Sequence, residues 1–264
     1  MKSGTSVSLP TELRAKIRNG QISGLTSGMA PGYVQANLVI LPKAQAFDFL
    51  LFCQRNQKPC PLLEVVEAGS FEPRSMAPGA DIRTDLPKYR VYEHGELIEE
   101  PTDITHAWRD DMVSFLLGCS FTFEEALVNA GIRIPHYETG KNTAMFITSI
   151  QTEPAGIFSG PMVVSMRAIP RDKVVKAVQI TSRYPAVHGA PVHIGNPEAI
   201  GVKDIHSPDL GDVAPVSDKD VPVFWGCGVT PQAVAMASKP PIMITHSPGH
   251  MFLTDKRNED IATL

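Results

Sequence analysis

Hydrophobic positions near the start of the chain predict a strand, a helix and a second strand. Residues 33–41 form an apolar, β-branched stretch, which predicts a buried strand. Residues 43–56 carry apolar side chains at helical spacing, and residues 62–66 predict the next strand. Because a helix is the usual connection between parallel strands, this order favours a partly parallel sheet.

A similar pattern returns in the last third of the chain. Residues 221–225 and 242–245 are apolar runs of strand length. Between them, Thr230 and Pro231 are typical of the N-cap and first residue of a helix, which we expect to extend to Ser238. The pattern therefore predicts a second β-α-β unit.

The middle of the chain is less regular. Residues 11–19 predict a short helix, and residues 67–86 lack periodicity, so we expect a long loop there. Residues 89–92 and 97–99 flank Glu93-His94-Gly95 and predict a hairpin. The local arrangement should change here from parallel to antiparallel.

Further helices and strands follow the hairpin. Apolar residues at helical spacing over residues 108–116 predict a helix ended by Gly118. Thr122 followed by Glu125 resembles a capping box that begins another helix, ended by Gly131.

The whole pattern predicts an α/β fold with a mixed, partly parallel sheet flanked by helices, and the length allows a smaller inserted domain. Residues 144–150 and 162–168 predict strands, and residues 171–183 a helix. We expect residues 1–100 and 165–264 to form the main domain and residues 101–164 the insertion.

Composition excludes several classes of protein. The chain has 264 residues, 43% hydrophobic and 20% charged, and a net charge of −4, which is ordinary for a globular protein. Its densest basic cluster is Lys256-Arg257, so a nucleic-acid partner is not expected. No apolar run is long enough to span a membrane, and the N-terminus shows no secretory signal. We expect a cytoplasmic protein.

The cysteines fit a reducing compartment. Cys53, Cys60, Cys119 and Cys227 form no C-x-x-C pair, and their spacing matches neither a disulfide framework nor a zinc knuckle. We expect free, mostly buried thiols.

The loop at residues 226–232 is a candidate anion site. It joins a predicted strand to a helix N-terminus, where free N–H groups favour a carboxylate or phosphate. Gly228, Thr230 and Gln232 are candidate substrate-binding residues, and the helix dipole could activate Cys227. A tight turn with a cap is the simpler alternative.

Two histidine-containing loops are further candidates. His246 and His250 follow the last predicted strand, which would open on the same sheet edge as residues 226–232 if the strands are parallel neighbours. Pro248 and Gly249 prevent the helical turn that a zinc-binding His-x-x-x-His needs. His188 and His193 are candidate proton carriers, although each could be a hydrogen-bonded structural histidine.

Three polar residues complete the candidate set. Ser120 follows Cys119 in a segment that is either a nucleophile site or a helix corner. Arg167 ends a predicted strand with the side chain best shaped to bind a carboxylate. Asp212 lies in a loop and is a candidate for substrate binding, with a simple turn as the alternative.

Long blocks of the sequence together resemble one family. They are GCSFTFEEAL (118–127), GPMVVSMR (160–167), HGAPVHIG (188–195), VPVFWGCGVTPQ (221–232) and ITHSPGHM (244–251), with PGYVQANL (31–38) and DIRTDLPKYRVY (81–92) upstream. The chain is similar over nearly its whole length to the D-glutamate cyclase family, whose bacterial members are labelled hydro-lyases. It departs from the family pattern at Gly226, Ala168 and Asn196. Asn196 removes a carboxylate near His193.

The resemblance implies an α/β fold with a smaller inserted α+β portion. It also implies a place in D-amino acid metabolism and a lyase reaction that closes D-glutamate to 5-oxo-D-proline with loss of water. In that reaction His188 or His193 would be the base and His246 or His250 the acid. Arg167 and the N–H groups of residues 227–230 would hold the carboxylates and the developing oxyanion. No cofactor is required by the sequence, the metal is unknown, and a divalent cation would fit the same chemistry.

Two alternatives remain open from the sequence. A non-catalytic protein could use the same loops to bind a small carboxylate or amino acid. A dehydratase acting on a different acid could instead use Cys119 or Cys227 as its reactive group. In each case the partner is a small molecule, and a homo-oligomer is compatible with the sequence.

Overall fold

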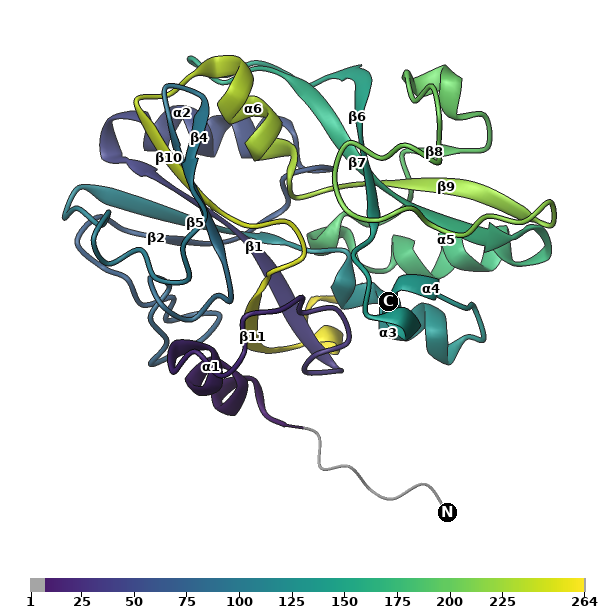
Figure 1. Ribbon diagram of the computed structural model, residues 1–264, viewed down its shortest axis with the longest axis horizontal. Helices are drawn as coiled ribbons and strands as arrows, with labels where there is room; N and C mark the ends of the chain where they lie inside the picture. The colour runs from purple at the N-terminus through teal and green to yellow at the C-terminus, as the bar shows by residue number, and fades with distance from the viewer. Residues whose placement is uncertain (1–7, 264) are drawn as a thin grey trace.

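The chain folds around two antiparallel sheets that lie side by side (Figure 1). The computed structural model describes residues 8–263, with Tyr137 and Glu138 described by their backbone alone. Residues 1–7, where we expect no secretory signal, lie outside the described residues. No helix in the described part of the chain is long and apolar enough to cross a membrane.

The larger sheet has seven strands in the order β2-β5-β1-β10-β3-β4, and β11 also pairs with β1. Every pair of neighbouring strands in it is antiparallel. The strands are β1 (Tyr33–Pro42), β2 (Leu62–Val66), β3 (Tyr89–Glu93), β4 (Glu96–Glu99), β5 (Met112–Gly118), β10 (Ile242–His246) and β11 (Phe252–Arg257).

The smaller sheet has four strands in the order β6-β7-β9-β8, all antiparallel to their neighbours. They are β6 (Ala144–Gln151), β7 (Pro161–Pro170), β8 (His193–Ile194) and β9 (Asp220–Gly226). The α-helices are α1 (Pro10–Arg18), α2 (Lys43–Arg55), α3 (Phe121–Asn129), α4 (Pro135–Thr139), α5 (Val174–Ser182) and α6 (Thr230–Ser238). Short 3₁₀ turns cover Arg171–Lys173, Pro185–Val187, Pro197–Ile200 and Asn258–Ile261.

Strand β1 is buried on both faces. Alternate residues from Val34 to Ile40 belong to the largest core cluster, whereas Val39 and Leu41 belong to a second cluster beneath α2. This period of two is the side-chain alternation of a strand. The largest cluster also contains Trp225 of β9, so the two sheets share one core.

The expected partly parallel sheet is wrong. Strands β1 and β2 do flank a helix in sequence, but β5 lies between them and pairs antiparallel with both. Strands β9 and β10, expected to be parallel neighbours, belong to different sheets. The apolar runs indicated burial on both faces, and here helices and the second sheet provide that burial for antiparallel strands.

Three local expectations near α3 and the C-terminal end also differ from the structure. The helix expected over residues 108–116 is strand β5, because a short apolar run fits a buried strand as well as a helix. Thr122 is not a cap, since it lies inside α3 and its hydroxyl accepts from the Gln35 N–H, at 3.1 Å. Strand β11 carries a mixed polar sequence and had no predicted counterpart.

Other expectations are confirmed. The hairpin of β3 and β4 forms around His94-Gly95, and no helix or strand interrupts residues 67–88. The predicted helices α1, α2, α5 and α6 are present. Strand β5 lies within residues 101–164 but joins the larger sheet; the division into domains stays a prediction.

Candidate functional site

The centre of the candidate site is a buried arginine, Arg167, near the end of β7. Its side chain is 1% exposed. Its Nε donates to Glu124 Oε1 at 3.0 Å, Nη1 to Ser165 Oγ at 3.0 Å and Nη2 to Ser120 Oγ at 2.9 Å. Nη2 also donates to Glu124. Since a guanidinium has five N–H groups, these bonds leave one N–H of Nη1 for a ligand.

Glu124 comes from the first turn of α3 and pairs with a histidine as well as with Arg167. The Nε2 atom of His136, on α4, lies 2.7 Å from Glu124 Oε1. Burial would raise the pKa of Glu124, but the charges and hydrogen bonds of His136 and Arg167 outweigh it and lower this pKa to about 2. Glu124 is therefore ionised, and its Oε2 has no hydrogen-bond partner among the described residues.

Aromatic rings surround this cluster. The Arg167 guanidinium lies 5.3 Å from the ring centre of Phe123 and 5.5 Å from that of Trp225. Such rings exclude water and attract a cation through their π faces. The ion pair is therefore held in a low-dielectric environment, where each interaction is stronger than in water.

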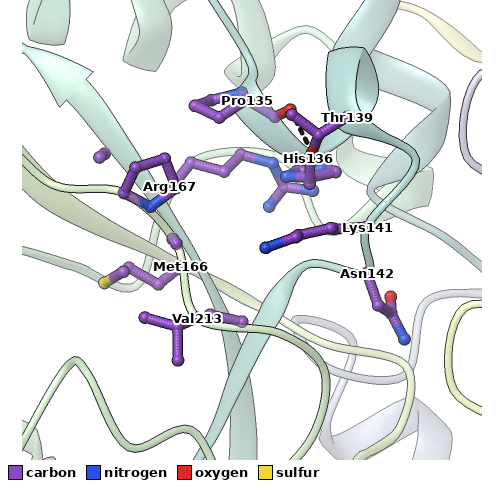
Figure 2. Close-up of a pocket in the computed structure, with 12 residues that line it drawn as sticks. Pro135, His136, Thr139, Lys141, Asn142, Met166, Arg167 and Val213 are labelled. Atoms are coloured by element: carbon purple, nitrogen blue, oxygen red, sulfur yellow. Dashed lines mark hydrogen bonds between the residues drawn. The ribbon is translucent and has the colours of Figure 1, made fainter.

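A pocket with about 360 Å³ of empty space, part of it open to solvent, reaches the cluster from the surface (Figure 2). Arg167 and His136 line its inner part, and Figure 2 shows the Lys141 ammonium pointing toward its centre. The other lining residues are mostly apolar or small: Pro135, Thr139, Asn142, Ala144, Met166, Ala168, Val213, Ala214 and Pro215. None of the described lining residues is acidic, which suits an anionic ligand.

The predicted Asp212 supports one edge of this pocket. It is exposed, and its Oδ2 accepts from the Asn142 N–H at 2.7 Å. Asn142 Nδ2 in turn donates to the Pro248 carbonyl at 3.1 Å, so the loop that carries His246 and His250 is attached to the pocket edge. Asp212 therefore positions Asn142 in this conformation.

The predicted thiols lie beside the cluster. Cys119 and Cys227 are buried, and each is close enough to Arg167 for its charge to affect the thiol pKa. Burial nevertheless raises both pKa values. The amides of Gly228 and Val229 face the Cys227 sulfur, so the expected activation by the helix dipole does not outweigh burial.

His188 is a buried neighbour of the same region. Its Nδ1 lies 2.8 Å from the Lys58 carbonyl oxygen, and Lys58 Nζ donates to the His188 carbonyl at 2.9 Å. Burial is the main cause that lowers the His188 pKa to about 4. The imidazole is therefore neutral near pH 7.

The loops at residues 226–232 and 245–250 do meet, although their strands are not parallel neighbours. Gln232 Nε2 donates to the His246 carbonyl at 2.8 Å, and Gln232 Oε1 accepts from Arg90 and Tyr92. His246 is fully buried, and the Leu38 N–H donates to its Nδ1 at 3.2 Å. Burial lowers the pKa of His246 to about 3.

The remaining predicted residues have contacts within the fold. Thr230 is fully buried and its hydroxyl donates to the Cys227 carbonyl at 2.7 Å. A Cβ on Gly228 would lie 1.9 Å from Asn37 Nδ2, so this glycine allows close packing of the loop on β1. His193 is half-buried, with Nε2 2.6 Å from the Asn196 carbonyl, and His250 is half-buried with Nδ1 3.1 Å from the Pro248 carbonyl.

The structure thus brings Arg167, Ser120, Cys119, Cys227 and His188 into one neighbourhood and leaves His193 at the edge of the smaller sheet. Sequence reasoning missed His136 and Lys141 and did not assign a role to Glu124. The available signal was Pro135-His136, because proline at the first position of a helix places the next side chain on a defined turn. No group of three His, Cys, Asp or Glu residues able to hold a metal ion occurs in the part of the chain that the structure describes.

Comparison with known proteins identifies the family. The family model described as D-glutamate cyclase matches residues 113–255. Relatives named "Putative hydro-lyase" include one from Bacillus velezensis that is 62% identical, covering 100% of both chains. Another from Bacillus subtilis is 61% identical and covers 97% of this chain and 99% of its own. A solved nitrogen repressor-like protein from Methanococcus jannaschii, with 11% identity, 96% and 99% coverage of the two chains and a TM-score of 0.38, is too dissimilar to support a common fold. The matched region and the full-length identity together show that this chain belongs to the D-glutamate cyclase family of enzymes.

Proposed function

We propose that the chain is a hydro-lyase that closes D-glutamate to 5-oxo-D-proline in the pocket beside Arg167. The observation that carries the proposal is the buried Glu124–His136 pair, next to Arg167, on the wall of a pocket whose described lining residues include no acidic one. Family membership and the hydro-lyase names of the relatives support the reaction class.

The reaction joins the two ends of one substrate. The amine nitrogen attacks the γ-carboxyl carbon, a C–N bond forms, and one C–O bond breaks. The substrate ammonium loses two protons, and the departing oxygen takes up two to leave as water. The protein must therefore hold the substrate folded, move protons between nitrogen and oxygen, and stabilise negative charge on the carboxyl oxygens.

His136 is placed to move the protons. It lines the pocket, and the ionised Glu124 holds its Nε2 and would stabilise an imidazolium. Arg167, through its remaining N–H, would bind the reacting carboxyl group and stabilise the oxyanion. The four histidines predicted from the sequence are absent from the described residues that line the pocket: His188, His193, His246 and His250. We therefore assign the proton transfer to His136.

The test is to incubate the protein with a panel of D- and L-amino and hydroxy acids and to detect the loss of one water by mass spectrometry. We expect D-glutamate to be converted and His136→Gln to reduce kcat by about 10² or more, the usual contribution of a general acid or base. His206→Gln is the matched control, because His206 is exposed and lies outside the pocket.

Two results would contradict the proposal. A folded His136→Gln variant with normal kcat would remove His136 from the mechanism. Tight binding of amino acids without any water loss across the panel would instead favour a non-catalytic binding protein.

A further inference from the structure

Lys141 supplies a charge that the cluster around Arg167 does not neutralise. Arg167 is paired with Glu124, so its charge is largely balanced. The Lys141 ammonium has no ion pair or hydrogen bond among the described residues, although it points into the same pocket (Figure 2). The described lining residues of the pocket therefore include two cationic groups and no acidic one.

The backbone on both sides of Lys141 has a defined conformation. Gly140, which ends α4, has a left-handed conformation with φ of 66°. On the other side, the Asn142 N–H is held by Asp212, and Asn142 Oδ1 accepts from the Thr143 N–H at 2.9 Å. These contacts hold the base of the lysine side chain at the pocket mouth.

Part of the wall of this pocket is apolar. Met166, Val213 and Ala214 line the pocket together with Arg167 and Lys141. A pocket that combines an apolar wall with two cationic groups matches a short methylene chain with a carboxylate at each end.

We propose that Lys141 determines the substrate class by binding the second, non-reacting carboxylate of a dicarboxylic amino acid. This assignment rests on the proposed function, because that function places the reacting carboxylate at Arg167 and His136. An ammonium is a compact charge on a flexible stem, so it can bind a carboxylate at a partly exposed site without a fixed bidentate geometry.

The inference is tested by ligand binding without turnover. Glutarate has two carboxylates and no amine, so it cannot cyclise, whereas butyrate has one carboxylate. Calorimetry should show that Lys141→Met weakens glutarate binding about tenfold or more, as expected for loss of a charge-assisted hydrogen bond. Butyrate affinity should be unchanged, and Lys141→Arg should retain most of the glutarate affinity.

Lys203→Met is the matched control, because Lys203 is exposed and does not line this pocket. For turnover, Lys141→Met should raise KM for D-glutamate with little change in kcat, the opposite of the expectation for His136→Gln. Equal weakening of glutarate and butyrate, unchanged glutarate affinity in Lys141→Met, or no glutarate binding by the wild type would each overturn the inference.

The two proposals can fail separately. If Lys141 is needed for glutarate binding but no amino acid loses water, the proposed reaction is wrong and the proposed dicarboxylate ligand is supported. If D-glutamate is converted with the same KM by Lys141→Met, the reaction stands and the role of Lys141 is wrong.

Discussion

Two fully buried polar centres of this protein are stabilised in different ways. Glu124 and Arg167 are buried as charges, and each has several partners. The buried imidazole of His246 makes polar contacts only with the Leu38 backbone, through Nδ1, and its Nε2 has no partner among the described residues. Its pKa of about 3 keeps it neutral.

The difference follows from the cost of desolvation. An isolated charge in a protein interior is far less stable than a neutral polar group, so a buried carboxylate needs a cation and hydrogen bonds nearby. A histidine can remain buried by giving up its proton. The charged centre lines a pocket through Arg167 and His136, whereas His246 ends β10 and contacts β1. We therefore assign chemistry to the first centre and a structural role to the second.

The largest expected effect is from breaking the charged pair. Arg167→Met leaves Glu124 buried without its guanidinium partner, so we expect the free energy of unfolding to fall by about 3–5 kcal/mol. Urea unfolding measures this change. The double variant Glu124→Leu with Arg167→Met should recover much of the stability but none of the activity. A single variant as stable as the wild type would contradict a buried ion pair.

An intermediate effect is expected at His246 and depends on pH. Its pKa is about 3 when folded and 6.5 ordinarily, so the unfolded chain binds a proton that the folded chain does not. The stability that the folded state gains from keeping His246 neutral is fully present above pH 6.5. It is lost as pH falls toward 3, by about 1.4 kcal/mol of unfolding free energy per pH unit.

The pH dependence of urea unfolding tests the role of His246. In His246→Gln the unfolding free energy should change less steeply with pH between pH 6 and pH 4, because about one proton fewer is bound on unfolding. His188 also has a lowered pKa and should keep part of the slope in this variant. An unchanged slope would show that His246 is protonated or exposed in the folded protein.

The smallest effect is expected at Asp212. Asp212→Ala removes the acceptor of the Asn142 N–H and should cost about 0.5–1.5 kcal/mol of unfolding free energy, whereas Asp212→Asn keeps an acceptor oxygen and should cost less. If Asp212 only positions the pocket edge, KM for D-glutamate should rise modestly in Asp212→Ala and recover in Asp212→Asn. A large loss of kcat in both variants would place Asp212 in contact with the substrate.

The sequence predicted most elements because their signals are local. Pro231 at the start of α6 and Gly95 in the hairpin each have a conformational preference that acts within a few residues. Strand β5 was missed because a short, fully buried apolar run has no period that separates a strand from a helix. Strand pairing was wrong because it depends on which distant segment inserts beside β1, which no local preference specifies.

The candidate site was predicted in part for the same reason. Arg167 became a candidate because its guanidinium is well shaped to bind a carboxylate, a property of the side chain that is visible without the fold. His136 lies 12 residues from Glu124 and on a different helix, so their pairing follows from the fold alone. His246, which the residue pattern favoured, is instead packed in the sheet.

Strand β1 connects segments that are synthesised far apart in time. One of its edges pairs with β5 and the other with β10 and β11, and Leu38 contacts His246 across 208 residues of sequence. During translation, one edge of the central strand therefore lacks its final partners until the last strands leave the ribosome. Non-local pairing of this kind slows folding and exposes a strand edge to other chains. The nascent protein should consequently depend on chaperones, or on a transient partner for that edge, more than its final compact fold suggests.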